Sequence, residues 1–168
     1  MLEILHCVMF PHPEYDLPMF GCDLVGGRGQ ISAAIADLSP LNRSGTLPFE
    51  YNTALGALPE LNFSRPRELP EWGEIFSEFC IFVRPGSPEE EQMFLSRVEN
   101  FLTIHCQNAI AAKPVSPDTA SKLLEGQLNY CTKQQQNDKT RRVLEKAFGS
   151  EWAEYYMTTV LFDVPQRK

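Results

Sequence analysis

The sequence predicts an α+β fold in which an antiparallel sheet is covered by helices. Segments with the alternation of strands fill the first forty residues, whereas helix signals dominate after residue 87. Strands followed by helices, rather than strands alternating with helices, favour an antiparallel sheet over a parallel one. The chain has 168 residues, of which 43% are hydrophobic and 22% are charged. One domain with a substantial buried core is therefore expected.

Three strands are expected in the first part of the chain, at 2–10, 19–25 and 31–38. A Pro-containing connection separates the first two, and the glycine-rich turn at 26–29 separates the second from the third. Alternate side chains of a strand share one face. This alternation places on one face Leu2, Ile4, His6, Val8 and Phe10 of the first strand, and Met19, Gly21, Asp23 and Val25 of the second.

The rest of the chain is expected to hold a long connection, a fourth strand and four helices. Residues 39–73 are rich in Pro, Gly, Asn and Ser and predict a mostly irregular segment, of a kind that often carries function. Residues 76–83 predict the strand. The helix starts are marked by Ser87 before Pro88 and three glutamates, by Ser116 before Pro117, by Asp138 and by Ser150. The buried stripes are expected at Phe94, Val98, Phe101, Leu102, His105 and Ala109, and at Leu124, Leu128 and Cys131; the last two helices are expected to end at Gly149 and Val160.

Charge and cysteine content exclude several classes of protein. The net charge is −7, which disfavours general binding to nucleic acid or to anionic membranes. No apolar stretch approaches the roughly 18 residues that span a bilayer, and no signal peptide is recognisable. The five cysteines form no C-x-x-C pair. These features predict reduced thiols in a cytoplasmic protein without a metal site.

Asp23 and His6 are the first candidates for chemistry. A carboxyl group on an apolar strand face loses hydration, and the usual result is a raised pKa that lets it donate a proton near neutral pH. Asp23 is alternatively a strand-end residue that bonds a turn or faces solvent. His6 is alternatively a core histidine with its hydrogen bonds satisfied. If the first two strands pair, His6 and Asp23 share a layer and can transfer protons.

The other candidate residues can also be interpreted as purely structural. Asn137, Asp138 and Lys139 open a helix, either as a solvated cap or as an acid beside an anion-binding cation. Arg67 and Lys139 suit ligand carboxylates. His105 and Cys106 are best interpreted as helix core residues. The turn at 26–29 lacks the dinucleotide-binding pattern, and the chain contains no P-loop, H-E-x-x-H or G-x-S-x-G motif.

Six segments together resemble one family. They are 4–11 (ILHCVMFP), 17–23 (LPMFGCD), 32–40 (SAAIADLSP), 67–70 (RELP), 72–77 (WGEIFS) and 137–142 (NDKTRR). These runs are similar to those of the ferredoxin-dependent bilin reductases, and the similarity extends over essentially the whole chain. The resemblance implies a single domain over 1–168. It also implies an α/β/α sandwich around the antiparallel sheet, with the bilin held between sheet and helices.

The resemblance also implies an activity. Members of the family reduce biliverdin IXα with electrons that ferredoxin delivers one at a time, using no metal or organic cofactor of their own, while side chains supply protons. The residues that match the family's catalytic positions are Asp23, His6, Asp138 and Asn137. Propionate contacts match Ser32, Arg67 and Lys139, and pocket walls match Val8 and Val143. Histidine at position 6 together with Asp23 favours phycocyanobilin as the product. A monomer is expected.

Ferredoxins of this kind are acidic, which makes the basic part of the chain the expected docking face. The first 110 residues carry a net charge of −9 and the remainder carries +2. The basic surplus lies at Lys133, Lys139, Arg141, Arg142 and Lys146. Because a positive patch on an acidic protein orients an acidic partner, docking is expected around Lys133, Arg141, Arg142 and Lys146.

The family pattern also includes an upstream segment, with a glutamate that protonates the D-ring vinyl group, which has no counterpart in this sequence. Three interpretations follow. The chain is an active bilin reductase, with phycocyanobilin or a phycoerythrobilin-type product. It is a bilin-binding module without full turnover. Or it is an interaction domain on the same scaffold. His6 and Asp23 favour the first, the missing glutamate favours the second, and the Arg67 and Lys139 cations argue against the third.

Overall fold

A four-stranded antiparallel sheet forms the centre of the computed structural model, which describes residues 2–42 and 44–163. The strands are β1 (Leu2–Met9), β2 (Met19–Gly27), β3 (Gln30–Ser39) and β4 (Ile81–Val83), in the order β1-β2-β3-β4. All neighbouring strands run antiparallel. The first three strands lie within two residues of their expected bounds, because each is apolar, alternating and closed by a turn.

The β2–β3 hairpin turns on Arg28 and Gly29, which have φ values of 55° and 75°. Positive φ at both central residues is typical of a type I′ turn, whose twist matches that of the strands. The register then shifts between Val25 and Gly26, which pair with Ala33 and Ile31 respectively. Ser32 is thus the extra residue of a β-bulge, and Ile31 and Ala34 both pack in the same core cluster although they lie three residues apart.

One expectation for the middle of the chain, the extent of the fourth strand, is wrong. Residues 76–80 do not join the fourth strand, because the backbone N–H and the hydroxyl of Ser77 donate hydrogen bonds to the Asp37 carboxylate. The 3₁₀-helix η1 (Gly73–Ile75) directly precedes these residues. The described residues of 39–73 are mostly irregular, as expected, and contain the helix α1 (Phe49–Gly56). Helix α1 is short and has no side-chain cap, so the sequence gives it no start signal.

The later helices are α2 (Pro88–Ala111), α3 (Pro117–Gln134), α4 (Asp138–Phe148) and α5 (Ser150–Tyr155), followed by the π-helix η2 (Tyr156–Leu161). Ser87 and Ser116 cap α2 and α3 as expected, each accepting a hydrogen bond from a backbone N–H. The cap of α4 is Asn137 and not Asp138, and α5 follows Gly149, at φ 91°, and not a serine cap.

The buried face of α3 also differs from expectation. Leu124 and Leu128 are only partly buried, and Ala109 of α2 is exposed. The buried side chains of α3 are Leu123, Gln127, Tyr130, Cys131 and Gln134. The buried face of α3 thus includes Leu123 in place of Leu124 and the polar residues Gln127 and Gln134. A search for regularly spaced apolar residues does not find polar residues of this kind.

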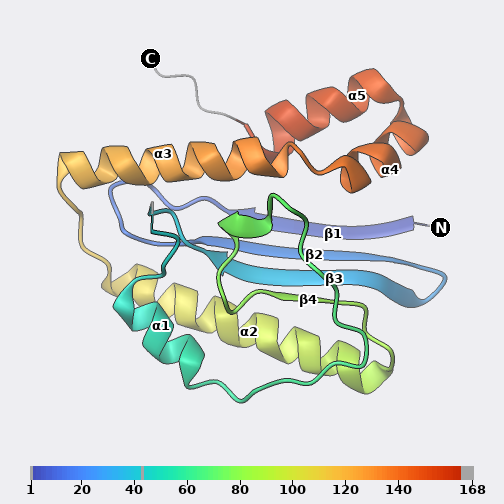
Figure 1. The fold of residues 1–168 in the computed structure, drawn as a ribbon, viewed down its shortest axis with the longest axis horizontal. Helices are drawn as coiled ribbons and strands as arrows, with labels where there is room; N and C mark the ends of the chain where they lie inside the picture. Colours follow the sequence, from blue (N-terminus) through green and yellow to red (C-terminus); the bar gives the residue numbers. More distant parts are fainter. Residues whose placement is uncertain (1, 43, 164–168) are drawn as a thin grey trace.

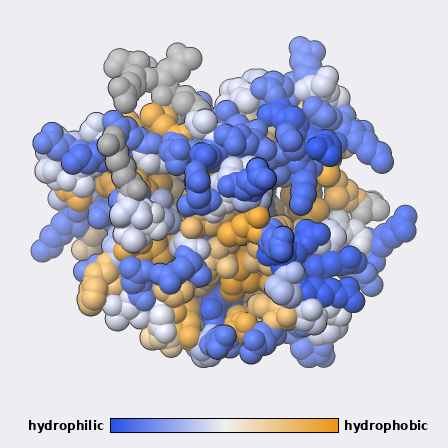
Figure 2. Space-filling model, viewed as in Figure 1, coloured by the Kyte–Doolittle hydropathy of each residue, from blue (hydrophilic) through white to orange (hydrophobic). Residues whose placement is uncertain are grey.

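The helices cover the sheet on both sides (Figure 1). Helices α1 and α2 lie on one side, where they pack with Phe20, Cys22, Ala34 and Leu38; we call this the α2 face. Helix α3, η1 and the C-terminal helices lie on the other, around Met19, Tyr130 and Phe162; we call this the α3 face. Figure 2 shows an apolar area in the middle of the surface, below the more hydrophilic C-terminal helices.

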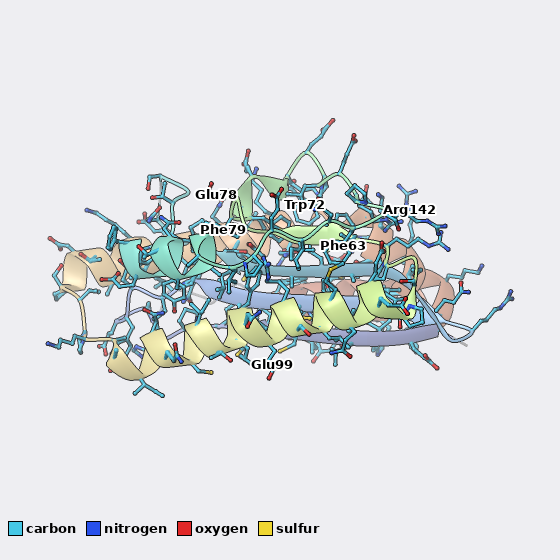
Figure 3. The ribbon with its side chains drawn as sticks, turned by 90° about the horizontal axis from the view of Figure 1, so that it is seen from below. Phe63, Trp72, Glu78, Phe79, Glu99 and Arg142 are labelled. Carbon is cyan, nitrogen blue, oxygen red and sulfur yellow. The ribbon has the colours of Figure 1, made fainter. Side chains whose placement is uncertain are left out.

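The segment 72–79 joins the two cores. Trp72 packs against the cluster on the α3 face, and Phe79 packs against the cluster on the α2 face (Figure 3). Ser77, which lies between them, is held by Asp37 of β3.

Among the described residues, no helix combines the length and the apolar composition needed to cross a bilayer.

Candidate functional site

His6 and Asp23 form the centre of the candidate site. They are directly opposite each other in the β1–β2 pair, and His6 Nδ1 is hydrogen-bonded to Asp23 Oδ1. Their side chains are 19% and 33% exposed, so the pair is neither fully dry nor free in water. Neighbouring residues opposite each other on adjacent strands share a face, and for this pair it is the α3 face. The pairing expected from strand alternation is confirmed.

The second nitrogen of His6 has no partner. Nε2 is buried and hydrogen-bonds to none of the described residues. The Phe162 ring packs edge-on against the imidazole at 5.6 Å between centroids. An unpaired buried polar atom costs about 1–3 kcal/mol, a cost that a ligand with a suitable polar group relieves. The π-helix η2 ends directly before Phe162, and such turns are frequent at functional sites.

Tyr130 of α3 closes the α3 face beside this pair. Its ring lies 6.4 Å from that of Phe162. Its hydroxyl accepts a hydrogen bond from Gln134 Nε2 at 3.0 Å and lies over Gly21, where a Cβ would be only 3.4 Å away. Burial raises the pKa of Tyr130, so it remains a neutral phenol. Because Gly21 has no side chain, the Tyr130 hydroxyl can lie close to β2, two residues along the strand from Asp23.

Asp37 is a second acid on the α3 face, and it is fully enclosed. It is 2% exposed and accepts hydrogen bonds from Ser39 Oγ at 2.6 Å and Ser77 Oγ at 2.5 Å, and from the Ser77 N–H at 3.0 Å. Burial raises the pKa of Asp37 to about 6, against these hydrogen bonds, which lower it. Asp37 therefore anchors the segment 72–79 and has no access to a ligand.

Arg67 stands at the opposite edge of the same face. Its guanidinium lies over the Phe82 ring, 5.4 Å from the centroid. Phe82 pairs with Ile35, Ile35 with Asp23 and Asp23 with His6, so these four side chains form one row across the sheet. Three strand spacings of about 4.8 Å make the row roughly 14 Å long. Within the described part of the chain Arg67 forms no ion pair, which leaves its charge available to an anion.

The structure brings two further expected residues to the sheet and leaves four apart from it. Val8 packs in the cluster of the α3 face, and the Ser32 hydroxyl donates to the Val25 carbonyl at 2.9 Å. The other four are Asn137, Asp138, Lys139 and Val143, on or next to α4, which lies on the same side as α3 (Figure 1). Among the described residues, none of the four forms a hydrogen bond or ion pair with His6 or Asp23.

The polar groups of α4 are engaged locally. Asn137 Oδ1 accepts the Thr140 N–H at 3.2 Å as the helix cap. Asp138 is 73% exposed on its side chain and faces Arg142 at 3.9 Å. Lys139 and Val143 are exposed. For Asn137 and Asp138 the structure thus has the capped, solvated helix start that was one of the two alternatives.

The expected docking cations differ in how far they are neutralised. Lys133 Nζ lies 2.7 Å from Glu74, and Arg141 is paired with Glu154. Arg142 is 77% exposed with only the distant Asp138 opposite it, and it lies at the outer edge of the molecule (Figure 3). Lys146 is exposed in the last turn of α4. The available positive charge therefore lies on α4.

A cavity of about 500 Å³ adjoins the site from the other side of Tyr130. It is bounded by η1, by α3 and by residues 40–42, 44 and 45, and its lining includes Tyr130, Glu74 and Asn129. A second cavity of about 330 Å³ lies on the outer surface of α2, around Met93 and Arg97. His6 and Asp23 line neither of them. Across the described residues, no group of three or more His, Cys, Asp or Glu side chains is placed to hold a metal ion.

Sequence reasoning missed Phe162, Tyr130, Gln134 and the role of Asp37. Tyr130 lies next to Cys131, which was placed on the buried stripe, so a wider stripe would have included it. Asp37 and Ser39 alternate with Ala36 and Leu38 in a strand, and that spacing was a usable signal for two polar groups on one face. Phe162 follows an irregular helix end, and its place over His6 had no sequence signal.

Comparisons with known proteins show the family of the chain. The profile of the family "Ferredoxin-dependent bilin reductase" matches residues 1–163. The chain is 64% identical over 164 residues to the phycocyanobilin:ferredoxin oxidoreductase of Trichodesmium erythraeum, covering 98% of this chain and 67% of that protein. It is 60% identical over 165 residues to the protein of the same name from Synechococcus elongatus, covering 98% and 66%.

A solved structure shares the fold. The tomato phytochromobilin synthase, crystallised with biliverdin, superposes with a TM-score of 0.80 at 19% identity, over 99% of this chain and 63% of that one. The expected α+β architecture is thereby confirmed. The chain spans about two thirds of the length of the curated relatives it matches. From the family match over nearly all of its residues, the chain belongs to the ferredoxin-dependent bilin reductase family.

Proposed function

We propose that the chain reduces biliverdin IXα to phycocyanobilin with electrons from reduced ferredoxin. The observation that carries the proposal is the hydrogen-bonded His6–Asp23 pair on the α3 face, with His6 Nε2 buried and unpartnered. The phycocyanobilin:ferredoxin oxidoreductases of Trichodesmium erythraeum and Synechococcus elongatus are 64% and 60% identical to this chain. The family is ferredoxin-dependent, so one-electron transfers from an external donor supply the reducing equivalents.

Asp23 is the proton donor in this proposal. Each electron added to a conjugated tetrapyrrole creates negative charge that a proton must neutralise, and a carboxyl group paired with an imidazole can deliver that proton. His6 Nδ1 faces Asp23, so its tautomer is coupled to the protonation of the carboxyl. Nε2 is then the atom that meets a carbonyl or pyrrole group of the bilin, and this contact satisfies a buried atom that now lacks a partner.

The bilin propionates are assigned to Arg67, Ser32 and Lys139. Arg67 is supported best, because its guanidinium stacks on Phe82 in the same row as Asp23 and has no carboxylate partner among described residues. A guanidinium fixed by a ring loses little entropy when it binds a carboxylate. Ser32 lies at the bulge of β3, and Lys139 in the first turn of α4. Val8 and Val143 provide apolar contact with the tetrapyrrole.

Asn137 and Asp138 are assigned to a second protic position. They lie at the start of α4, on the α3 side of the sheet. Since Asp138 is exposed and only weakly paired with Arg142, it can reach a bilin only if the ligand extends to the surface at α4. The proposal therefore gives Asp138 a smaller share in proton supply than Asp23.

Ferredoxin docking is assigned to Lys133, Arg141, Arg142 and Lys146, with Arg142 and Lys146 dominant. The latter two are the exposed and least neutralised members of the set. The exposed rings of Phe148 and Trp152, whose centroids lie 4.5 Å apart at an interplanar angle of 42°, lie at the end of the same helix hairpin. Interfaces commonly combine such an aromatic contact with a charged rim. Charge reversal at Arg142 should slow reduction at low salt, whereas reversal at exposed Arg84 should not.

We further infer a monomer in a reducing, cytoplasmic setting that binds neither nucleic acid nor membranes. Five free cysteines and a net charge of −7 support this part of the proposal. Electrons from ferredoxin are the only redox input it needs, without a metal or organic cofactor of the chain's own.

The decisive experiment is an anaerobic assay with biliverdin IXα, reduced ferredoxin and the wild-type chain, followed by absorption spectroscopy and product chromatography. Biliverdin should bind and be converted to phycocyanobilin. A phycoerythrobilin-type product would contradict the assigned product but keep the activity. Binding without conversion, in a chain shown to be folded, would make it a bilin-binding module. Failure to bind biliverdin at all would overturn the proposal.

A further inference from the structure

Cys7 and Cys22 lie directly opposite each other in the β1–β2 pair. They are the next residues along the register from His6 and Asp23. Alternation places the two thiols on the α2 face, behind the strand backbone that carries the His6–Asp23 pair on the α3 face. Both side chains belong to one cluster, Cys22 as a buried member and Cys7 packed against it.

The two thiols differ in access. Cys22 is 5% exposed, and burial raises its pKa to about 11, with smaller contributions from Asp23 and Cys7. Cys7 is partly exposed on β1, which is an edge strand of the sheet among the described residues. An external reagent can therefore reach Cys7 first, and Cys22 is the thiol that lies next to it.

The backbone geometry suits a disulfide with a small adjustment. Residues directly opposite in an antiparallel pair have Cα atoms about 4.5 or 5.5 Å apart, and both values fall within the roughly 4.4–6.8 Å that disulfides span. Their Cβ atoms are usually about 4.5–5.5 Å apart, whereas a disulfide requires about 3.5–4.5 Å. Bond formation therefore draws β1 toward β2, and an edge strand held on one side can make that movement.

We propose that Cys7 and Cys22 are a reversible redox modification site that forms a cross-strand disulfide next to the His6–Asp23 pair. The oxidant is a low-molecular-weight disulfide such as oxidised glutathione. The Cys7 thiolate attacks one of its sulfurs, forming a mixed disulfide and releasing one glutathione thiolate. The Cys22 thiolate then attacks the Cys7 sulfur and releases the second glutathione. Two protein thiols are oxidised, two protons are lost and the glutathione disulfide is reduced to two thiols.

Two consequences follow from the position of the bond. Because the closure strains the strand pair, the disulfide is readily reduced and reversible. Because the bonded residues directly adjoin His6 and Asp23, the movement of β1 also shifts the hydrogen bond between these side chains. This site does not depend on the proposed bilin chemistry, and its existence can be tested on the free chain.

The test is mass spectrometry of the folded chain after incubation with oxidised glutathione and alkylation of the remaining thiols. No Lys or Arg lies between residues 1 and 28, so trypsin leaves both cysteines in one peptide, which should lose two hydrogens and resist alkylation. Cleavage after Glu14 should then give two peptides joined by the bond. A phosphine reductant should restore both free thiols.

Matched variants identify the pairing. Cys22→Ser should stop the reaction at a Cys7–glutathione adduct, Cys7→Ser should give neither product, and Cys106→Ser, at an exposed helix position, should leave the bond intact. NMR of the His6 imidazole in the wild type should show a shift on oxidation that reverses on reduction. Alkylation of Cys7 and Cys22 after exposure to the oxidant, or a bond from Cys7 to another cysteine, would overturn the proposal.

Discussion

The α2 face and the α3 face of the sheet are made from alternate residues of the same strands. The α2 face carries Phe20, Ala34 and Leu38, and its buried polar contact is the 3.0 Å hydrogen bond between Tyr51 Oη and His105 Nδ1. The α3 face carries His6, Asp23 and Asp37, each with a polar partner. The α2 face therefore supplies most of the dry packing that stabilises the fold, and the α3 face carries the groups capable of chemistry.

The difference shows how one sheet can serve both purposes. Close-packed apolar side chains on the α2 face fix the strands, so the α3 face can keep a buried atom without a partner at His6 Nε2. Substitutions in the apolar core of the α2 face should then act on stability, and substitutions at Asp23 and Arg67 should act on bilin turnover and binding. The following predictions test that division.

The largest expected effect is on turnover. Asp23→Asn keeps the shape of the side chain and removes the acid, so reduction of biliverdin should slow by about 10²–10⁴-fold while biliverdin still binds. Single-turnover absorption changes under anaerobic conditions measure the rate, and titration measures the affinity. Turnover at the wild-type rate would remove Asp23 from the role of donor.

On the α2 face, the substitution with the largest expected effect on stability is Phe101→Ala. Phe101 is 0% exposed in the centre of α2, and removing a buried phenylalanine side chain costs about 3–5 kcal/mol of unfolding free energy. Urea denaturation measures the loss. Leu95→Ala is the control, since Leu95 on the same helix is 44% exposed and should change stability by only about 0.5 kcal/mol. Equal losses in both variants would contradict the assignment of the core.

Affinity for the bilin should depend on Arg67 more than on Lys139. A charge-assisted hydrogen bond contributes about 1.5–3 kcal/mol, so Arg67→Gln should weaken binding by about tenfold or more. Lys139→Gln should have a smaller effect, because Lys139 is exposed on α4 whereas Arg67 is held over Phe82. Fluorescence or absorption titration with biliverdin compares them. Unchanged affinity in both variants would refute the propionate assignment.

The titration of Asp37, on the α3 face, should make the free energy of unfolding depend on pH. Burial raises its pKa from 3.8 to about 6 in the folded chain. The folded state therefore binds the proton more tightly than the unfolded state, so this contribution is largest below pH 4 and is lost as the pH rises to about 6. Urea denaturation from pH 4 to 7 should show Asp37→Asn gaining stability relative to wild type across that interval. A constant difference would contradict it.

The titration of His105, on the α2 face, should make the free energy of unfolding depend on pH in the opposite direction and by a smaller amount. Burial lowers its pKa below 6.5, so the folded state holds the neutral imidazole. Its contribution to stability is present above pH 6.5 and is lost as the pH falls through the lowered pKa. Denaturation of His105→Gln and wild type between pH 5 and 7.5 should converge toward the acid end. Divergence toward acid pH would show that the histidine is charged in the folded chain.

Much of the fold and part of the site could be predicted from the sequence. Alternation located β1, β2 and β3, and Ser87 and Ser116 marked the starts of α2 and α3, because these signals are local. The same alternation placed His6 and Asp23 on one face and made their pairing an expectation. Arg67 and Lys139 were identified only as cations suited to carboxylates.

The tertiary structure decided what local signals do not contain. The Asp37–Ser77 contact spans 40 residues and holds residues 76–80 in a turn where the start of the fourth strand was expected, because a buried carboxylate needs hydrogen-bond donors. Phe162 reached His6 through the packing of η2. Lys133 and Arg141 are neutralised by Glu74 and Glu154, which lie on other segments. Local sequence thus determined the elements, and long-range hydrogen bonds and packing determined which side chains meet.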